Sequence, residues 1–171
     1  MRIVALFIVF TITYFSNTPH LMVSDIHSWV NTSSYEQNIN FFDIFKKNSV
    51  FYNPWSDVRD LEFYLHKVGH FTFYGSLSVF LFWKSTNRKT FLLKLILIAG
   101  FAFADEIHQY YVVGRTGRIM DVYFDMASAM FCLALIFAFG KAKKESKVKR
   151  QVTAFNSKKR YSFFKRLKTE N

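Results

Sequence analysis

Residues 119–139 read IMDVYFDMASAMFCLALIFAF, an apolar run in which Asp121 and Asp125 are the only charged side chains. A bilayer-spanning helix needs about 20 predominantly apolar residues at a rise of 1.5 Å each, so this run is long enough to cross a membrane. Further apolar blocks precede it at about residues 2–18, 64–83 and 91–111. The sequence therefore predicts an all-α membrane protein with a bundle of about four transmembrane helices.

The composition agrees with the membrane class. Hydrophobic residues make up 51% and aromatic residues 20% of the 171 residues, more than a soluble core of this size needs. The single cysteine, Cys132, excludes an internal disulfide and a cysteine-based zinc site. An alternative for the first block is a cleaved signal peptide, because Arg2 precedes an apolar run, although no small-residue cleavage pattern follows.

The positive charge predicts the topology. The net charge is +11, and residues 141–171 alone carry twelve Lys or Arg against two Glu. Because cytoplasmic flanks of membrane spans are enriched in Lys and Arg, this basic tail should be cytoplasmic. Counting spans backwards then places the N-terminus inside and residues 19–63 in an extracellular loop. We expect a transmembrane domain at 1–140 and a cytoplasmic tail at 141–171.

Ionisable residues near the ends of the apolar blocks form the candidate site. A charged side chain at the bilayer centre costs about 2.5–3.5 kcal/mol, so each one needs a partner or a wet cavity. The predicted topology places all of these residues at the outer ends of their helices, where we expect one cluster. Its members are Lys67, His70, Tyr74, Asp105, Glu106, His108, Gln109, Arg115, Arg118, Asp121 and Asp125.

Binding of an anionic group is the role we favour for this cluster. Arg115 and Arg118 lie in a turn between the third and fourth blocks, and Gly114 and Gly117 permit a tight backbone there. Guanidinium groups suit phosphate and carboxylate because they donate paired hydrogen bonds. Together with Lys67, the two arginines would hold the anion.

Acid–base catalysis is an open alternative for the same residues. His108 or His70 would move a proton, since histidine titrates near neutral pH. The adjacent acids Asp105 and Glu106 would orient the histidine or accept the proton. The sequence alone does not separate this role from anion binding.

Metal binding has weaker support. His66 with His70, and Asp121 with Asp125, have the i, i+4 spacing of helical metal ligands, but no specific metal motif is present. The nearby cations would also repel a metal ion, so we expect no metal and no cofactor. Two non-enzymatic alternatives are a binding or partner protein whose charges form an interhelical salt-bridge network, and a small transporter or proton relay.

These residues, taken in order, resemble the motifs of the VanZ-like family of small bacterial membrane proteins. The matching motifs are Lys67-x-x-His70-Phe71-x-x-Tyr74, then Asp105-Glu106-x-His108-Gln109, then Arg115 or Arg118 in a glycine-containing turn, followed by Asp121. Phe15, Ser16, Asn17 and Pro19 are similar to the family's end of helix one. The chain departs from the pattern at His66, where the family has Asp, and at Asp125, where it has Asn.

The resemblance implies a multi-pass protein of the bacterial cell membrane and, in some members, reduced sensitivity to teicoplanin-type glycopeptide antibiotics. It implies no settled reaction. We expect an envelope protein whose outward-facing cluster recognises or modifies an anionic lipid-linked or cell-wall-related group.

The basic tail has its own expected partner. Aromatic residues interleave with the cations of residues 141–171, a pattern typical of an amphipathic helix on an anionic inner leaflet. The alternative is a disordered tail that enforces topology. Nucleic acid is not an expected partner, because the tail has no nucleic-acid-binding motif.

Overall fold

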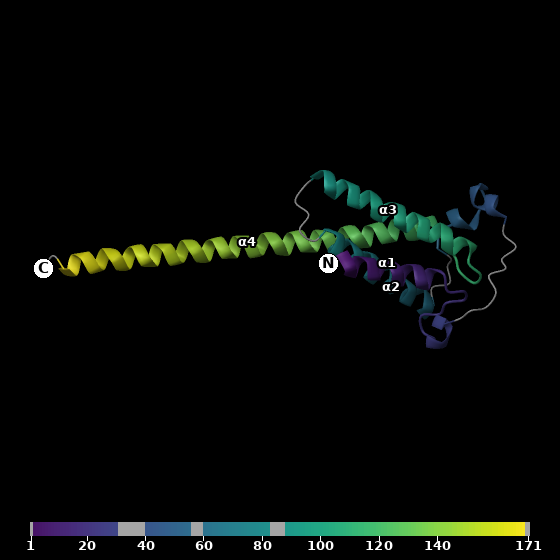
Figure 1. The fold of residues 1–171 in the computed structure, drawn as a ribbon, viewed down its shortest axis with the longest axis horizontal. Helices are drawn as coiled ribbons and strands as arrows, with labels where there is room; N and C mark the ends of the chain where they lie inside the picture. Colours follow the sequence, from purple (N-terminus) through teal and green to yellow (C-terminus); the bar gives the residue numbers. More distant parts are fainter. Residues whose placement is uncertain (1, 31–39, 56–59, 83–87, 170–171) are drawn as a thin grey trace. The chain divides into compact units, whose positions relative to one another are not determined.

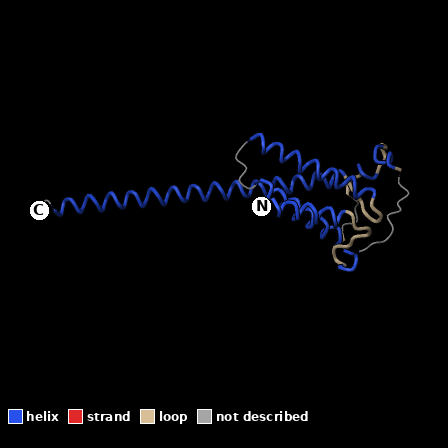
Figure 2. Tube along the Cα trace, viewed as in Figure 1, coloured by secondary structure: helices blue, strands red, loops and turns tan. Residues whose placement is uncertain are grey.

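The computed structural model describes residues 2–30, 40–55, 60–82 and 88–169, and these residues form helices and no strands. The α-helices and 3-10 helices are α1 (Arg2–Ser16), η1 (Ile26–Val30), η2 (Phe41–Phe45), η3 (Val50–Tyr52), α2 (Leu61–Phe82), α3 (Arg88–Tyr111) and α4 (Ile119–Thr169), as Figures 1 and 2 show. The predicted all-α class is confirmed. Each of the four α-helices overlaps one of the four apolar blocks, and α4 continues beyond the last block to Thr169.

The chain divides into two compact units, Met1–Leu133 and Ala134–Asn171, and α4 contributes to both. The second unit is helical as far as Thr169. The amphipathic membrane-surface role of the basic tail stays a prediction.

In the first unit, consecutive helices run in alternate directions (Figure 1). Ser16 at the end of α1 donates a hydrogen bond to Asp105 near the end of α3. Lys67 near the start of α2 pairs with Asp121 at the start of α4. The C-terminal ends of α1 and α3 therefore meet the N-terminal ends of α2 and α4, and Ser16, Lys67, Asp105 and Asp121 lie at this end.

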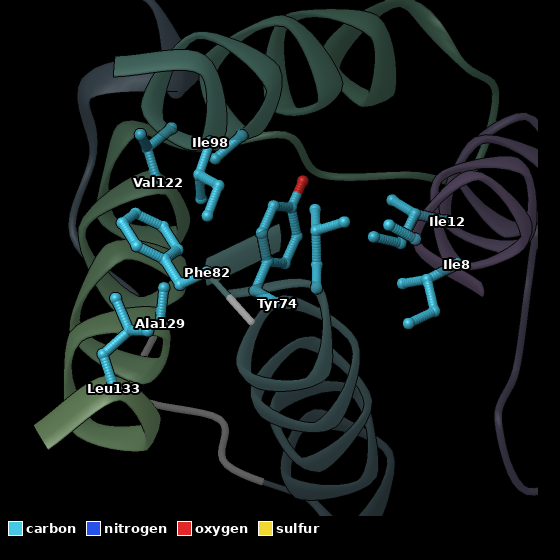
Figure 3. Packing of buried hydrophobic residues seen from close by; sticks show 11 residues of the cluster. Ile8, Ile12, Tyr74, Phe82, Ile98, Val122, Ala129 and Leu133 are labelled. Carbon is cyan, nitrogen blue, oxygen red and sulfur yellow. The ribbon is translucent and has the colours of Figure 1, made fainter. Parts of the chain in front are cut away.

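The apolar core lies between the four helices (Figure 3). Tyr74 of α2, Ile98 of α3 and Ala129 of α4 are each at most 1% exposed. Helices α2 and α4 approach closely, because a Cβ atom at Gly75 would lie 2.6 Å from the Sγ atom of Cys132. A larger residue at this position would require the Cys132 side chain to move.

One helical stretch among the described residues, Ile119–Phe139, is long and apolar enough to cross a membrane by length and composition. The apolar helix Ile3–Ser16 is shorter. Helices α2 and α3 have the length of a span, but they carry charged residues, including Lys67 and Glu106. The four-span topology stays a prediction.

A short segment after α1 closes over the polar end of the bundle. The backbone N–H of His20 donates to the carbonyl of Val113, 3.0 Å away, in the turn after α3. The carboxylate of Glu62 accepts hydrogen bonds from the backbone N–H groups of Val23 and Ser24. Residues 20–24 are thereby fixed to both the α3–α4 turn and the first turn of α2.

Candidate functional site

Two adjoining cavities open at the polar end of the first unit, with volumes of about 270 Å³ and 290 Å³. We call them the apolar cavity and the polar cavity after the side chains that line them. The walls of both contain Leu21, His66, His70, Gln109 and Arg115. The two cavities therefore share a boundary made of these five residues.

The apolar cavity lies between α1, α2 and α3. Apolar side chains from α1 and α2, including Ile12, Phe15 and Phe73, form its walls, and Trp29 of η1 also lines it. A Cβ atom at Gly69, which also lines this cavity, would have no heavy atom within 4 Å. The cavity is thus shaped for a hydrocarbon group and has room beside Gly69.

The polar cavity is lined largely by charged side chains. They come from the segment before α2, from α2 itself, from the α3–α4 turn and from the start of α4. The charged members are Asp60, Glu62, Lys67, Arg115, Arg118 and Asp121. Which of these charged side chains can bind a ligand depends on the hydrogen-bond and ion-pair partners that each already has.

Asp105 is the centre of a closed hydrogen-bond network. The hydroxyl of Ser16 donates to Oδ1 at 2.5 Å, and the Tyr74 hydroxyl donates to Oδ2 at 3.2 Å. The Gln109 side-chain amide donates to Oδ2 at 3.1 Å and also to the Ser16 Oγ atom at 2.8 Å. This buried carboxylate is satisfied by neutral donors from α1, α2 and α3.

Arg115 is buried in the turn after α3, with 8% of its surface exposed. Its Nη2 donates to Gln109 Oε1 at 2.8 Å, and its Nη1 lies 2.9 Å from His66 Nε2. Because a guanidinium has only donors, His66 Nε2 must accept, and the His66 ring is neutral. Burial lowers the pKa of Arg115 from its ordinary value, while nearby carboxylates oppose this shift.

Arg118 fixes the other end of the same turn. Its backbone N–H donates to Glu106 Oε2 at 2.9 Å, and its Nη1 donates to the carbonyl of Pro54 at 3.0 Å. The turn passes so close to α3 that a Cβ atom at Gly117 would lie 1.9 Å from the Glu106 carbonyl oxygen. Glycine is therefore required at 117, and the tight turn places Arg118 beside Glu106.

Neither guanidinium has an ion-pair partner in the described part of the chain. No carboxylate of these residues lies within salt-bridge distance of Arg115 or Arg118, and the Nε atom of each is buried without a hydrogen-bond partner. Lys67 differs, because it pairs with Asp121. The Lys67 ammonium also lies 4.9 Å from the ring centre of Trp55, whose Nε1 donates to Asp121 at 2.6 Å.

A second group of acids surrounds His70. Its Nδ1 atom lies 2.9 Å from Asp125 Oδ1 and 3.8 Å from Glu106 Oε1. Both acids are wholly buried. Glu106 Oε1 and Asp125 Oδ2 accept no hydrogen bond from the described part of the chain.

The structure brings together most of the residues predicted from the sequence. Ten of the eleven lie in the connected networks and cavities described above, and His108 does not. His108 is exposed, lines neither cavity and has its Nε2 3.1 Å from Asn17 Oδ1. Gln109 links Asp105 to Arg115, because its side-chain N–H donates to Asp105 and its side-chain oxygen accepts from Arg115.

Three residues of the site were missing from the predicted set. Ser16 binds Asp105, His66 binds Arg115, and Trp55 binds Asp121. Ser16 has a recognisable signal, because it is the polar residue that ends the apolar run of α1. Trp55 has none, since it comes from the long connection before α2.

Comparison with curated proteins and with solved structures returned no match. A protein-family model described as VanZ/LLP1 matches residues 2–140, which include all four apolar blocks and every residue of both cavities. The chain therefore belongs to the VanZ/LLP1 family.

Proposed function

We propose that this VanZ-like envelope protein crosses the bacterial cell membrane with four helices and recognises an anionic lipid-linked or cell-wall-related group on its outer side. The observation that carries the proposal is the pair of guanidiniums in the wall of the polar cavity, neither of them ion-paired within the described residues. Both chain termini are cytoplasmic in this proposal, and the polar end of the bundle faces outward.

The acids in the polar cavity already have donors. Glu62 accepts from Val23 and Ser24, and Asp121 accepts from Lys67. Asp60 accepts from the backbone N–H of Phe63. Arg115 and Arg118 are the two cations of the wall without an ion-pair partner among the described residues. A phosphate or carboxylate in the polar cavity would supply the anionic partner that the two guanidiniums lack among the described residues.

The adjoining apolar cavity indicates that the ligand is amphiphilic. Arg115 lines both cavities, so an anion bound there would lie beside a space walled by Phe15, Phe73 and Trp29. A soluble anion would use only the polar cavity. A lipid-linked anion would use both, with its head group on the arginines and a hydrocarbon chain between α1 and α2.

The outer surfaces of the helices support a membrane location. Helix α1 buries Ala5, Ile8 and Ile12, yet its opposite side is also apolar. The exposed residues there are Ile3, Leu6, Phe7 and Phe10, each at least 68% exposed. Helix α3 likewise exposes Leu92, Leu93, Ile96 and Leu97. A helix that is apolar on all sides but only half covered by protein is suited to contact lipid chains.

Binding of a short-chain phosphatidylglycerol to the purified full-length protein tests this proposal. We expect binding to weaken about ten-fold or more in Arg115→Gln, because a charge-assisted hydrogen bond contributes about 1.5–3 kcal/mol. Arg118→Gln should act in the same direction. Unchanged affinity in both variants would refute the anion site.

Glycerol phosphate, which lacks acyl chains, separates the two cavities in the same assay. Filling the apolar cavity with Gly69→Leu should weaken binding of the lipid but not of glycerol phosphate. Gly100→Leu is the matched control, because Gly100 is a helical glycine that lines neither cavity, and a Cβ atom added there would also have no heavy atom within 4 Å. Equal loss in Gly69→Leu and Gly100→Leu would contradict the role of the apolar cavity.

Teicoplanin susceptibility tests the cellular consequence. A sensitive bacterial host that expresses this chain should become less susceptible to teicoplanin, and Arg115→Gln should remove the protection while the protein still inserts in the membrane. Protection that survives in Arg115→Gln would instead favour a non-enzymatic partner protein that acts by occupying the membrane.

The interhelical-network alternative is favoured by one observation, the Lys67–Asp121 pair. Exchanging the two residues, as Lys67→Asp with Asp121→Lys, restores the pair with opposite polarity. Recovery of lipid binding in the double variant, after loss in each single variant, would assign this pair a scaffold role.

A further inference from the structure

His70 of α2, Glu106 of α3 and Asp125 of α4 place three metal-ligating groups within 4.8 Å of one another. Each comes from a different helix, so the group exists only when the bundle is folded. From the sequence we expected no metal, since the candidate i, i+4 pairs lie along single helices and do not contain this set of three residues. The arrangement goes beyond the proposed anion site, which uses the arginines.

The atoms nearest each other are His70 Nδ1, Asp125 Oδ1 and Glu106 Oε1. The nitrogen lies 2.9 Å from the first oxygen and 3.8 Å from the second. Ligand atoms about 2.0–2.2 Å from one ion are separated by about 3–3.5 Å in octahedral or tetrahedral geometry. The two separations from the histidine nitrogen lie on either side of that range, and all three ligand atoms lie within 4.8 Å of one another, so the side chains must adjust to bring all three onto one ion.

An independent observation points to a ligand at this position. Glu106 Oε1 faces the histidine nitrogen and is completely buried, yet it accepts no hydrogen bond from the described residues. Asp125 Oδ2 is also buried without a donor among them. Buried carboxylate oxygens without partners are costly, and a cation would satisfy them.

The charges favour a divalent ion. Two buried carboxylates share one histidine as their nearest charged partner, which supplies at most a single positive charge. The nearby ammonium of Lys67 is already paired with Asp121. A divalent cation bound to neutral His70 would balance both acids, whereas no other described side chain in contact with them can.

We propose that His70, Glu106 and Asp125 bind one divalent transition-metal ion, such as Zn²⁺ or Mn²⁺. A nitrogen and two carboxylate oxygens suit these ions. His70 also lines both cavities, so one of the three ligands borders the proposed ligand space, while Glu106 and Asp125 are wholly buried behind it.

Metal content of the full-length protein tests the site. The protein is purified in detergent without a polyhistidine tag, incubated with Zn²⁺ or Mn²⁺, desalted and analysed by mass spectrometry for bound metal. We expect about one ion per chain in the unmodified protein, and loss of most of it in Glu106→Gln and Asp125→Asn. Metal retained equally in both variants would overturn the proposal.

Asp105→Asn is the matched control. Asp105 is also a buried carboxylate and is adjacent to Glu106 in the chain, but its oxygens already have three donors. This variant should retain the metal at the unmodified level. Equal metal loss in Asp105→Asn and Glu106→Gln would mean that the loss reports general unfolding and would contradict a site at these three residues.

A measurement on the unmodified protein does not depend on whether the variants fold. Removing metal with a chelator should lower the unfolding temperature by several degrees, and re-adding Zn²⁺ or Mn²⁺ should restore it, because an ion that binds only the folded state stabilises it. No bound metal and no shift in unfolding temperature would refute the metal site and leave the anion site at Arg115 and Arg118 standing.

Discussion

Asp105 and Glu106 follow one another on α3, yet the first carboxylate accepts three side-chain hydrogen bonds, while the second has a buried oxygen that accepts none from the described residues. The same contrast holds for the cations at this end of the bundle. Lys67 is paired with Asp121, whereas Arg115 has no carboxylate partner in the described part of the chain.

This contrast divides the polar end into two sides. The closed side comprises the Asp105 network and the Lys67–Asp121 pair, in which every charge has its partner within the protein. The open side is made of Glu106, Asp125, Arg115 and Arg118, each of which has a buried atom without a partner among the described residues. Substitution on the closed side should therefore cost stability, and substitution on the open side should cost binding.

Lys67→Met should give the largest loss of stability. Removing one partner of a buried ion pair leaves the other charge unmatched and costs about 3–5 kcal/mol. Only the Trp55 indole N–H, among the described donors, would still bind Asp121. Thermal unfolding in detergent measures the effect, with Lys67→Arg as the charge-preserving control. A loss below about 1 kcal/mol would show that the pair is exposed to water and does not belong to the closed side.

Asp105→Ala should come next, at about 3 kcal/mol, because the variant leaves buried donors on Ser16, Tyr74 and Gln109 without their acceptor. Asp105→Asn keeps one acceptor oxygen and should lose less. Chemical denaturation of the two variants compares them. If Asp105→Ala is as stable as the unmodified protein, the hydrogen bonds to Asp105 do not stabilise the fold, and Asp105 does not differ from Glu106 in the way proposed.

Gly117→Ala tests the turn that joins the two sides. Its added methyl group would meet the backbone of Glu106 and Tyr110, which cannot move independently, so we expect a loss of about 2 kcal/mol. Gly100→Ala is the control, since the methyl group there meets nothing and alanine favours a helix by about 0.5–1 kcal/mol. If Gly117→Ala unfolds at the same temperature as Gly100→Ala, the turn is not tight.

Glu106→Gln should change the free energy of unfolding the least, and the sign of this change distinguishes the two sides. With metal removed by a chelator, Glu106→Gln can keep the hydrogen bond from the Arg118 backbone N–H and removes a buried charge whose Oε1 accepts no hydrogen bond from the described residues, so stability should stay unchanged or rise by up to about 1 kcal/mol. Asp105→Asn, measured under the same conditions, should lower it. Destabilisation by Glu106→Gln as large as that by Asp105→Ala would place Glu106 on the closed side.

The sequence predicted the helices well because their apolar blocks are long and are separated by charge. The predicted block at 91–111 and the observed helix Arg88–Tyr111 share the same C-terminal residue. The short connections were also foreseeable where two glycines made a tight turn necessary. The 3-10 helices before α2 were not foreseeable, since they have no apolar period and depend on local caps such as that of Ser49.

The sequence predicted which residues form the site better than it predicted which of them contact one another. Costly charges near helix ends identified ten residues that the structure brings together. Which acid meets which base depends on helix rotation, and that rotation cannot be read from the sequence. On α3, for example, Asp105 and Gln109 are buried and bonded to each other, whereas His108 is exposed. His66 was seen as a metal candidate and proved to be a partner of Arg115.

Residues 20–24 belong to the walls of both cavities, through Leu21 in both and Val23 in the apolar one. Glu62 and the carbonyl of Val113 hold this segment in place by its backbone. If the segment parts to admit a ligand and closes behind it, these hydrogen bonds are the same before and after binding. They then govern how quickly a ligand exchanges and not how tightly it is held. A substitution at Glu62 would then change the residence time of the ligand without changing its contacts with Arg115 and Arg118.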